Sequence, residues 1–262
     1  MIRALYTAAS GMAAQQSNID NVAHNLSNVN TTGFKRSRME FEDLVYQQIK
    51  TAGTPTSTSA EAPTGLEVGL GTRPVATVRD FSTGNLRSTS NPLDVAIEGR
   101  GFLQVSLPDG GIGYTRAGSL HLSGEGLLVT NDGYPIEPQI TIPPNALSVS
   151  ISKDGIVSVT LSGQSAAQQV GTLELASFQN PAGLAGIGAN LFTVTTASGE
   201  PTTGVPGTDG MGTLAQGFLE ESNVSVVEEM VNMILGQRAY EANSRVVKAA
   251  DEMLAQVNNM AR

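Results

Sequence analysis

The two ends of the chain share one pattern, in which apolar or small residues recur three or four positions apart. In the first thirty residues the series runs from Ile2 to Leu26, and in the last forty it runs from Val231 to Met260. Such steps place the side chains on one stripe of an α-helix. We therefore predict a long helix at each end, with an apolar face that water cannot cover favourably. Ser222 or Asn223 is expected to cap the second helix.

Between the ends the hydrophobic period changes from about three and a half to two. Short alternating runs are separated by Asp-Gly pairs at positions 109–110, 132–133 and 154–155. Asp-Gly is a strong hairpin signal, because both turn residues need positive φ. Stretches rich in Thr, Ser, Pro and Gly flank this region. The predicted fold class is α+β, with the terminal helices forming a coiled coil. The predicted segments are helix 1–34, an extended linker segment with short strands 35–91, a central all-β domain 92–200, a linker 201–220 and helix 221–262.

Each predicted helix has two possible partners for its apolar face. The two helices can pair with each other inside one chain, or they can pack against further copies of the chain. Pairing within the chain would leave much of the outer surface of two long helices in water. If copies pack through the stripes, the expected interface residues are Leu5, Met12, Ile19, Asn21, Asn25, Leu26, Asn28, Val231, Leu235, Val246, Met253 and Val257.

A line of amides accompanies the first apolar stripe. Asn18, Asn21, Asn25 and Asn28 follow one another at steps of three, four and three. Asn is a poor residue for a helix interior, and a solvated face more often carries Glu and Lys. The line fits a packed interface that needs neutral donors and acceptors. An Asn-rich, frayed helix end explains it equally well.

Composition removes several classes of function. The formal net charge is −9 and basic residues form no long run, so a nucleic-acid partner is not expected. No cysteine is present, which excludes disulfides and thiolate metal sites. No stretch of about 20 apolar residues exists, and the N-terminus lacks the apolar core of a secretory signal. We therefore expect no membrane insertion, and either a cytoplasmic location or export without cleavage.

The sequence offers little for catalysis. The two histidines, His24 and His121, lie far apart along the chain and are interpreted as structural. The loose G-x-G-x-x-A match at 210–215 lies in a predicted linker, where a dinucleotide site is not expected. Turn carboxylates are scattered, whereas a glycosidase needs a converging pair. The scattered carboxylates are Asp94, Glu98, Asp132 and Glu137. We therefore predict no catalytic, cofactor-binding or metal-binding residues and no cofactor.

Three groups of motifs resemble the bacterial flagellar rod and hook family. The first is NLSNVNTTGFK at 25–35. The second is NPLDVAIEGRGF at 91–102, continued by YTRAG at 114–118 and NDGYP at 131–135. The third begins with ESNV at 221–224 and ends with QRAYEAN at 237–243. They occur in the family's order and span nearly the whole chain.

The resemblance implies a structural, self-assembling role. Subunits of this family leave through the flagellum's own type III export apparatus without signal cleavage, and they polymerise into a hollow helical tube. The terminal helices line the tube as a coiled coil, and the β-domain faces outward. The implied location is the periplasm-spanning basal body. The implied partners are further copies, proximal rod subunits, hook subunits and the outer rings that act as a bushing.

Within that family, the segment 45–87 resembles the distal rod type best, which implies a drive shaft that carries torque. We expect its Thr/Pro-rich part to stiffen the polymer, with Thr51, Pro55, Pro63 and Leu66 as marker residues. A proximal rod or hook subunit of the same family is the alternative. Two other classes stay open, namely a β-rich extracellular binding module or adhesin and an enzyme that degrades the cell wall.

Overall fold

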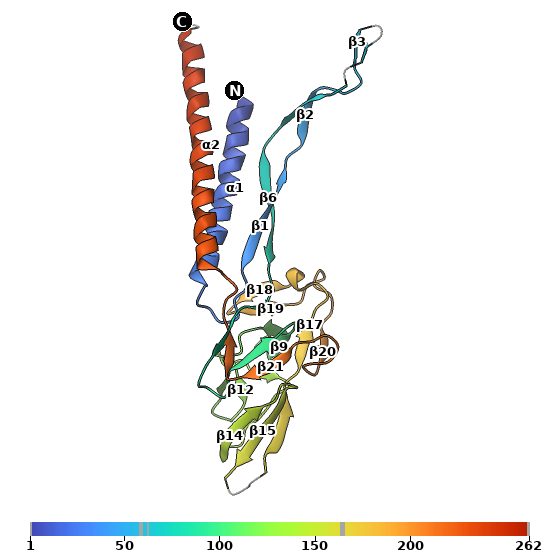
Figure 1. Cartoon of the computed structure of the whole chain (residues 1–262), viewed down its shortest axis with the longest axis vertical. Coiled ribbons are helices and arrows are strands. Elements are labelled where there is room, and N and C mark those ends of the chain that lie inside the picture. The colour runs from blue at the N-terminus through green and yellow to red at the C-terminus, as the bar shows by residue number, and fades with distance from the viewer. Residues whose placement is uncertain (1, 58–59, 62, 163–165, 261–262) are drawn as a thin grey trace. The chain divides into compact units, whose positions relative to one another are not determined.

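The computed structural model describes residues 2–57, 60–61, 63–162 and 166–260. The chain is a mixed α+β protein with a helix at each end (Figure 1). It divides into two compact units. One, here called the helical unit, contains Met1–Leu26, Ser37–Val78 and Ser225–Arg262, and the other, the β unit, contains Ser27–Arg36 and Arg79–Val224. The helical unit is therefore assembled from three separate parts of the chain.

Two long helices, α1 (Ile2–Ser27) and α2 (Val226–Met260), lie side by side in the helical unit (Figure 1). Small residues make the contact. Ala14 and Ala250 are buried, and Gly11 lies so close to Asn243 that a Cβ on the glycine would be 2.8 Å from the amide nitrogen. Small side chains let the two backbones approach closely.

The start of α2 differs from the prediction. The backbone N–H of Glu229 donates to the Ser225 carbonyl (3.0 Å), and the helix begins at Val226. Ser225 is therefore the residue at the helix start. Asn223, predicted as a cap, instead accepts from the backbone N–H of Arg36 (2.8 Å) and donates to the Asp80 carbonyl (2.9 Å). Its amide is occupied inside the β unit, so it does not cap the helix.

The remainder of the helical unit is a two-stranded ribbon built from three nested strand pairs (Figure 1). Most side chains of β1, β2, β5 and β6 are exposed or only partly buried. Because neither face of the ribbon is a core face, the sequence shows only weak alternation there. The pairs are β1 (Ser37–Asp43) with β6 (Thr72–Arg79), β2 (Tyr46–Lys50) with β5 (Leu66–Gly69), and β3 (Pro55–Ser57) with β4 (Ala60–Glu61).

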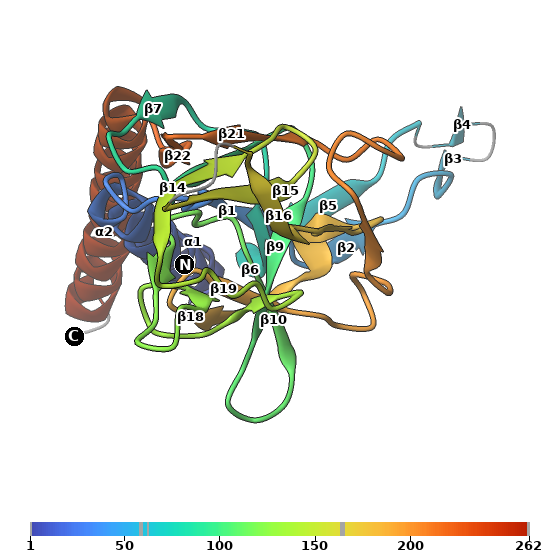
Figure 2. The same ribbon diagram turned by 90° about the horizontal axis from the view of Figure 1, so that it is seen from below.

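Seven strands of the β unit form its main sheet. The order along the sheet is β18 (Ala185–Gly188), β19 (Leu191–Thr193), β10 (Ile112–Thr115), β9 (Phe102–Ser106), β17 (Leu175–Ser177) and β20 (Thr202–Gly204), with β13 (Ile136–Glu137) also pairing with β9. A second sheet contains three antiparallel strands, visible together in Figure 2: β14 (Ala146–Ile151), β15 (Ile156–Leu161) and β16 (Gln168–Thr172).

Three further strand pairs complete the unit, together with the short 3-10 helix η1 (Pro181–Gly183). They are β7 (Leu86–Ser88) with β22 (Phe218–Glu220), β8 (Val95–Glu98) with β21 (Thr213–Gln216), and β11 (His121–Leu122) with β12 (Leu128–Val129). The segment 201–220, expected to be a linker, thus contains β20, β21 and β22. Its Gly- and Pro-rich turns concealed the short strands from the sequence analysis. Strands β21 and β22 pair with β8 and β7, which lie more than 100 residues earlier in the chain.

The β unit has an apolar core and a separate aromatic cluster. The core includes Ile97, Leu103 and Leu175, all with no exposed surface. In the cluster, Phe102 makes edge-to-face contacts with Phe81, Phe178 and Phe192 at centroid distances of 5.4–6.1 Å. Such geometry is favoured by the ring quadrupole. Gly110, Gly133 and Gly155 have φ near +80° and lie in turns, as predicted, but the aspartates before them do not have positive φ. The prediction that both residues of each Asp-Gly pair have positive φ was therefore wrong, because each glycine N–H donates to the carbonyl three residues earlier and closes a longer turn.

Candidate subunit-assembly surface

Helix α2 exposes an apolar face along its whole length. Leu235 is 62% exposed, Val257 53% and Met253 47%, and Val231 and Val246 are similarly exposed. The face toward α1 carries Gly236 and Ala250 instead. Every C-terminal residue predicted to lie in a subunit interface is therefore exposed in the single chain, although Val257 shares the heptad position of Gly236 and Ala250. Contiguous exposed apolar surface of this kind marks an interaction site.

The predicted residues of α1 are less exposed than those of α2. Leu5, Met12, Ile19 and Leu26 are all partly buried. Ile19 packs against α2, because a Cβ added at Gly236 would lie 3.1 Å from its Cγ1 atom. The two predicted stripes thus differ. The stripe on α1 is partly covered within the chain, whereas the stripe on α2 faces outward.

The amide line on α1 holds the ribbon. Asn25 is 1% exposed, its side-chain oxygen accepts from the Ser37 N–H (3.0 Å), and its amide donates to the Ser37 carbonyl (2.8 Å). Asn21 donates to the same carbonyl (2.8 Å) and accepts from the Ser37 hydroxyl. Asn25 also donates to Glu229 of α2 (3.3 Å). The prediction of an intersubunit role for Asn25 needs correction, because a side chain so buried in its own chain cannot reach a neighbour.

Asn28 lies just beyond the end of α1, where the turn begins. Its side-chain oxygen accepts from the Thr31 hydroxyl (3.2 Å), and the Thr31 N–H donates to the Asn28 carbonyl (3.1 Å). The side chain is partly buried. Asn28 thus contributes to the turn that ends the helix, as expected of Asn next to a helix C-terminus.

The ribbon carries the residues predicted to stiffen a polymer. Thr51 is exposed, and its carbonyl accepts from the Thr54 hydroxyl in the turn before β3. Pro55 begins β3, opposite Glu61. Pro63 is exposed, and Leu66 is exposed in β5 opposite Lys50. Other large apolar side chains on the ribbon are also uncovered: Val45, Tyr46, Ile49 and Val75.

A buried triad of charges lies in the β unit, and the sequence analysis missed it. Lys35 Nζ lies 2.6 Å from Glu220 Oε1, and Arg116 Nε lies 2.8 Å from Glu220 Oε2. Arg116 also donates to the carbonyl oxygens of Gly99 and Gly101, both at 3.0 Å. All three charged side chains are almost completely buried. The triad joins the segment after α1 to the segment before α2.

The electrostatics of the triad follow from burial and from the excess of positive charge. Burial, followed by the nearby Arg116, lowers the pKa of Lys35, although Glu220 acts in the opposite direction. Burial alone would raise the pKa of Glu220, but Arg116 and Lys35 together outweigh it, so that the pKa lies below 4.5. Glu220 therefore stays ionised at neutral pH. Its carboxylate also accepts from the Gly84 N–H (2.9 Å).

Two members of the triad lie in the motifs quoted above, Lys35 at the end of 25–35 and Arg116 in the middle of 114–118. Opposite charge was the only signal available for pairing them with Glu220. No spacing or period links positions 35, 116 and 220, because their meeting depends on the sheet topology.

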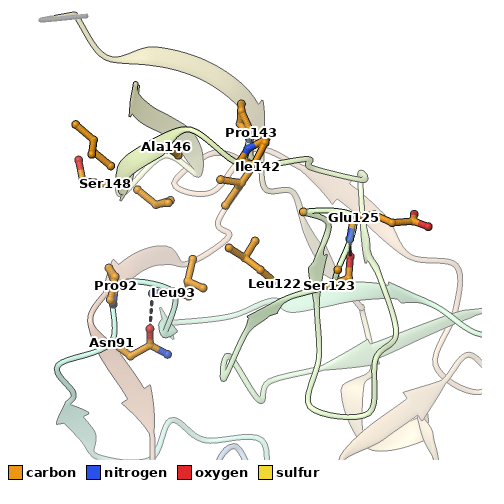
Figure 3. Close-up of a pocket in the computed structure, with 15 residues that line it drawn as sticks. Asn91, Pro92, Leu93, Leu122, Ser123, Glu125, Ile142, Pro143, Ala146 and Ser148 are labelled. Carbon is orange, nitrogen blue, oxygen red and sulfur yellow. Dashed lines mark hydrogen bonds between the residues drawn. The ribbon is translucent and has the colours of Figure 1, made fainter. Parts of the chain in front are cut away.

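One hollow of about 480 Å³ lies on the β unit between the loop 91–93, the β11–β12 hairpin and the start of β14 (Figure 3). Its lining is mainly apolar and includes Leu93, Leu122, Ile142 and Pro143. In Figure 3 the carboxylate of Glu125 points away from the hollow. The lining contains no arrangement of acid, base and nucleophile among the residues that the structure describes.

The residues weighed for catalysis have separate positions. His24 is exposed on α1, and His121 is exposed in β11. Asp94 is buried and accepts from Thr89 (2.7 Å) and Asn91 (2.8 Å), so it fixes a loop. Over the described ranges, no three His, Asp or Glu side chains gather as a metal site. In the same part of the chain, neither helix has the length and apolar character that crossing a bilayer requires.

Three family models match the chain in sequence order. "Flagella basal body rod protein" matches residues 5–35, "Flagellar hook protein FlgE/F/G D1 domain" matches 96–159, and "Flagellar basal body rod FlgEFG protein C-terminal" matches 215–260. None of these descriptions is that of a catalytic family. The first match covers most of α1, and the third covers all of α2.

Full-length relatives give a sharper result. The chain is 50% identical to the flagellar basal-body rod protein FlgG of Buchnera aphidicola subsp. Schizaphis graminum, over 99% of this chain and 100% of that protein. It is 51% identical to FlgG of Borreliella burgdorferi over the whole of both chains. It is 48% identical to FlgG of Caulobacter vibrioides over 97% of each.

Proposed function

Because the chain belongs to the family of the flagellar basal-body rod protein FlgG, and is thus a structural subunit of the flagellar basal-body distal rod, we propose that its copies assemble through their terminal helices into a hollow, rigid helical tube. The tube transmits torque from the motor to the hook, and its bore is the export channel. The chain has no catalytic role.

The exposed apolar face of α2 carries this proposal. Fully burying a Val, Leu or Met side chain stabilises a complex by roughly 1.5–3 kcal/mol. Leu235, Val246, Met253 and Val257 are each about half exposed in the single chain, so a neighbouring helix has apolar surface to bury at each of them. Contacts between copies through this face, with α1 alongside, form the proposed coiled coil.

Pairing of α1 with α2 and packing between copies are compatible. Small residues such as Gly11, Ala14, Gly236 and Ala250 occupy the contact inside the chain, and the large apolar residues of α2 lie on its outer side. Helix pairing within one chain and helix packing between copies, which the sequence left as alternatives, can therefore both occur. One face of α2 belongs to the chain itself, and the other is available to a neighbour.

The remaining parts of the proposal follow from the family. The helices 1–34 and 221–262 line the tube, and the domain 92–200 faces outward. Further copies, proximal rod subunits and hook subunits are the axial partners, and the outer rings surround the rod as a bushing. The location is the flagellar basal body, across the periplasm, after export without a cleaved signal peptide.

The ribbon is the proposed stiffening element. Its uncovered residues, Val45, Tyr46 and Ile49 among them, give it apolar surface that contact with a neighbouring copy would bury. Deleting residues 51–63 is expected to give a flexible or curved polymer, measured as persistence length in electron micrographs. A polymer as straight and stiff as wild type would show that the ribbon does not contribute to rigidity.

The central experiment tests the helix face. Leu235→Asp and Met253→Asp each place a charge on the proposed interface, where an unpaired buried charge is strongly unfavourable. Wild-type chain seeded with sheared polymer is expected to form straight hollow tubes, seen by electron microscopy. Under the same conditions both variants should stay folded and monomeric. Gln237→Asp, on an exposed position of the same helix, is the matched control and should assemble. Tubes from Leu235→Asp at the wild-type concentration would contradict the proposal.

A further inference from the structure

Arg79, the last residue of β6, has an unusual setting in the β unit. Its guanidinium carbon lies 5.1 Å from the centroid of the Phe192 ring. Gly186 is the register partner of Phe192 on the neighbouring strand, and a Cβ at Gly186 would lie 2.5 Å from a guanidinium nitrogen. The guanidinium therefore occupies a slot that exists because residue 186 has no side chain. Phe192 and Gly186 thus both lie against the guanidinium.

The donors of this guanidinium are not used within the described chain. A guanidinium has five N–H donors, which lie in its plane. The Phe192 ring lies beneath the guanidinium carbon and attracts the cation, but it offers no oxygen or nitrogen acceptor for the N–H donors. No hydrogen bond or ion pair joins the Arg79 side chain to any residue that the structure describes. Burial also lowers the pKa of Arg79, and no carboxylate acts against that effect.

The other arginines show how unusual this is. Arg116, the most buried, pairs with Glu220, and the partly buried Arg36 pairs with Asp80. The exposed Arg38, Arg73, Arg87 and Arg238 also have acidic partners. Among the arginines with described side chains, Arg79 alone combines partial burial with the lack of a carboxylate partner. The chain has 24 acidic side chains for 15 basic ones, so shortage of acid is not the reason.

We propose that Arg79, held between Phe192 and Gly186, binds a carboxylate of an Asp or Glu side chain from a second copy of this chain. Carboxylate geometry matches the fork of a guanidinium, which donates two parallel bonds to it. A second copy is the favoured source because the chain carries a net charge of −9 and, in the proposed polymer, presents its acidic side chains at high local concentration. The inference rests on the proposed self-assembly and adds one specific polar contact to it.

The first test compares assembly of four purified full-length chains, each seeded with sheared wild-type polymer. Arg79→Gln removes the charge and should raise the critical concentration for assembly by about tenfold, the size expected for loss of a charge-assisted hydrogen bond. Arg100→Gln makes the same charge change at an exposed position and is the matched control. Gly186→Ala keeps every charge but fills the slot, and it should also raise the critical concentration.

The second test identifies the carboxylate and does not depend on how well Arg79→Gln folds. Arg79→Lys places a primary amine in the slot, which a carbodiimide joins to a carboxylate in direct contact. Polymer made from a mixture of ¹⁵N-labelled and unlabelled Arg79→Lys chains should give a crosslinked peptide of mixed isotope content at residue 79. Monomer should give none.

The outcomes separate the two proposals. If wild-type chain forms no polymer, the proposed function fails first. If wild-type chain polymerises while Arg79→Gln and Arg100→Gln assemble alike, or if the crosslink at residue 79 joins two peptides of one chain, the inference about Arg79 is overturned and the helix-mediated assembly stands.

Discussion

The β unit and the helix pair bury their residues by opposite rules. In the β unit the large apolar side chains are inside, and Ile97, Leu103 and Leu175 have no exposed surface. On helix α2 the small residues Gly236 and Ala250 are buried, and large apolar residues such as Leu235 and Met253 are exposed. A monomer that buried the largest apolar residues of α2 would have that face of the helix turned toward α1. The β unit therefore buries its own large apolar residues, whereas α2 leaves large apolar side chains exposed, as the proposed assembly requires.

The largest expected effect breaks the β unit at its charge triad. Glu220→Gln leaves Lys35 and Arg116 buried without a compensating anion, and loss of one member of a buried ion pair costs about 3–5 kcal/mol. The free energy of unfolding of the monomer, from urea denaturation, should fall by that amount. Glu221→Gln, one residue away and partly exposed, is the control. Equal losses in the two variants would show that the triad adds nothing specific.

The same change, leucine to alanine, can be made once in the β unit and once in α2 to compare the two regions directly. Leu175→Ala creates a cavity in the core of the β unit and should lower the free energy of unfolding by about 2–5 kcal/mol. Leu235→Ala removes a side chain that is mostly in water, so the monomer should change by less than about 0.5 kcal/mol. The same variant should weaken polymer assembly. A large loss of monomer stability for Leu235→Ala would mean that α2 packs within the chain through its outer face.

Acid should act on the β unit through Glu220. Its folded-state pKa lies below 4.5, so as pH falls the unfolded chain takes up this proton first. The stabilisation from Glu220 is complete above pH 4.5 and is lost as pH falls through the folded-state pKa. Thermal unfolding followed at decreasing pH should show a steeper loss for wild-type chain than for Glu220→Gln. Parallel pH curves for the two chains would contradict this assignment.

The smallest effect concerns the helix contact. Gly236→Ala improves helix propensity by about 1 kcal/mol. The added Cβ lies 3.1 Å from Cγ1 of Ile19, a side chain that must move by a few tenths of an ångström. The two effects oppose each other, so the free energy of unfolding should change by less than about 1 kcal/mol. Gly236→Leu requires a much larger displacement of α1 and should lower it clearly. A neutral Gly236→Leu would show that the helices do not pack closely at this point.

Local patterns were sufficient to predict the terminal helices and many of the hairpins. The three-and-four stripe ends near Leu26 because the following residues form a turn, and Gly110 and Gly155 occupy turns because glycine tolerates positive φ. The motif resemblance supplied the family, which composition and period did not.

Long-range pairing was not predictable from local patterns. Strand β22 pairs with β7, and Lys35 meets Glu220, across more than 100 residues. Nothing in the neighbourhood of any of these residues signals its partner. The direction of the stripe on α2 was also hidden, because a helical period says which residues share a face and does not say whether that face meets α1 or another chain. Asn25 shows the same limit, since its amide fits an interface of either kind.

The division of the helical unit between both ends of the chain has a consequence for the order of folding. Helix α1 contains the first residues and its partner α2 the last, so their contact closes a loop that includes almost the whole sequence. Such closure is entropically the most expensive and kinetically the slowest type of contact. The hairpins of the β unit are local by comparison. In a chain synthesised from its N-terminus, every segment of the β unit is complete before α2 exists, so α1 must wait for its partner. The α2 face proposed for assembly therefore belongs to the last part of the chain that can fold.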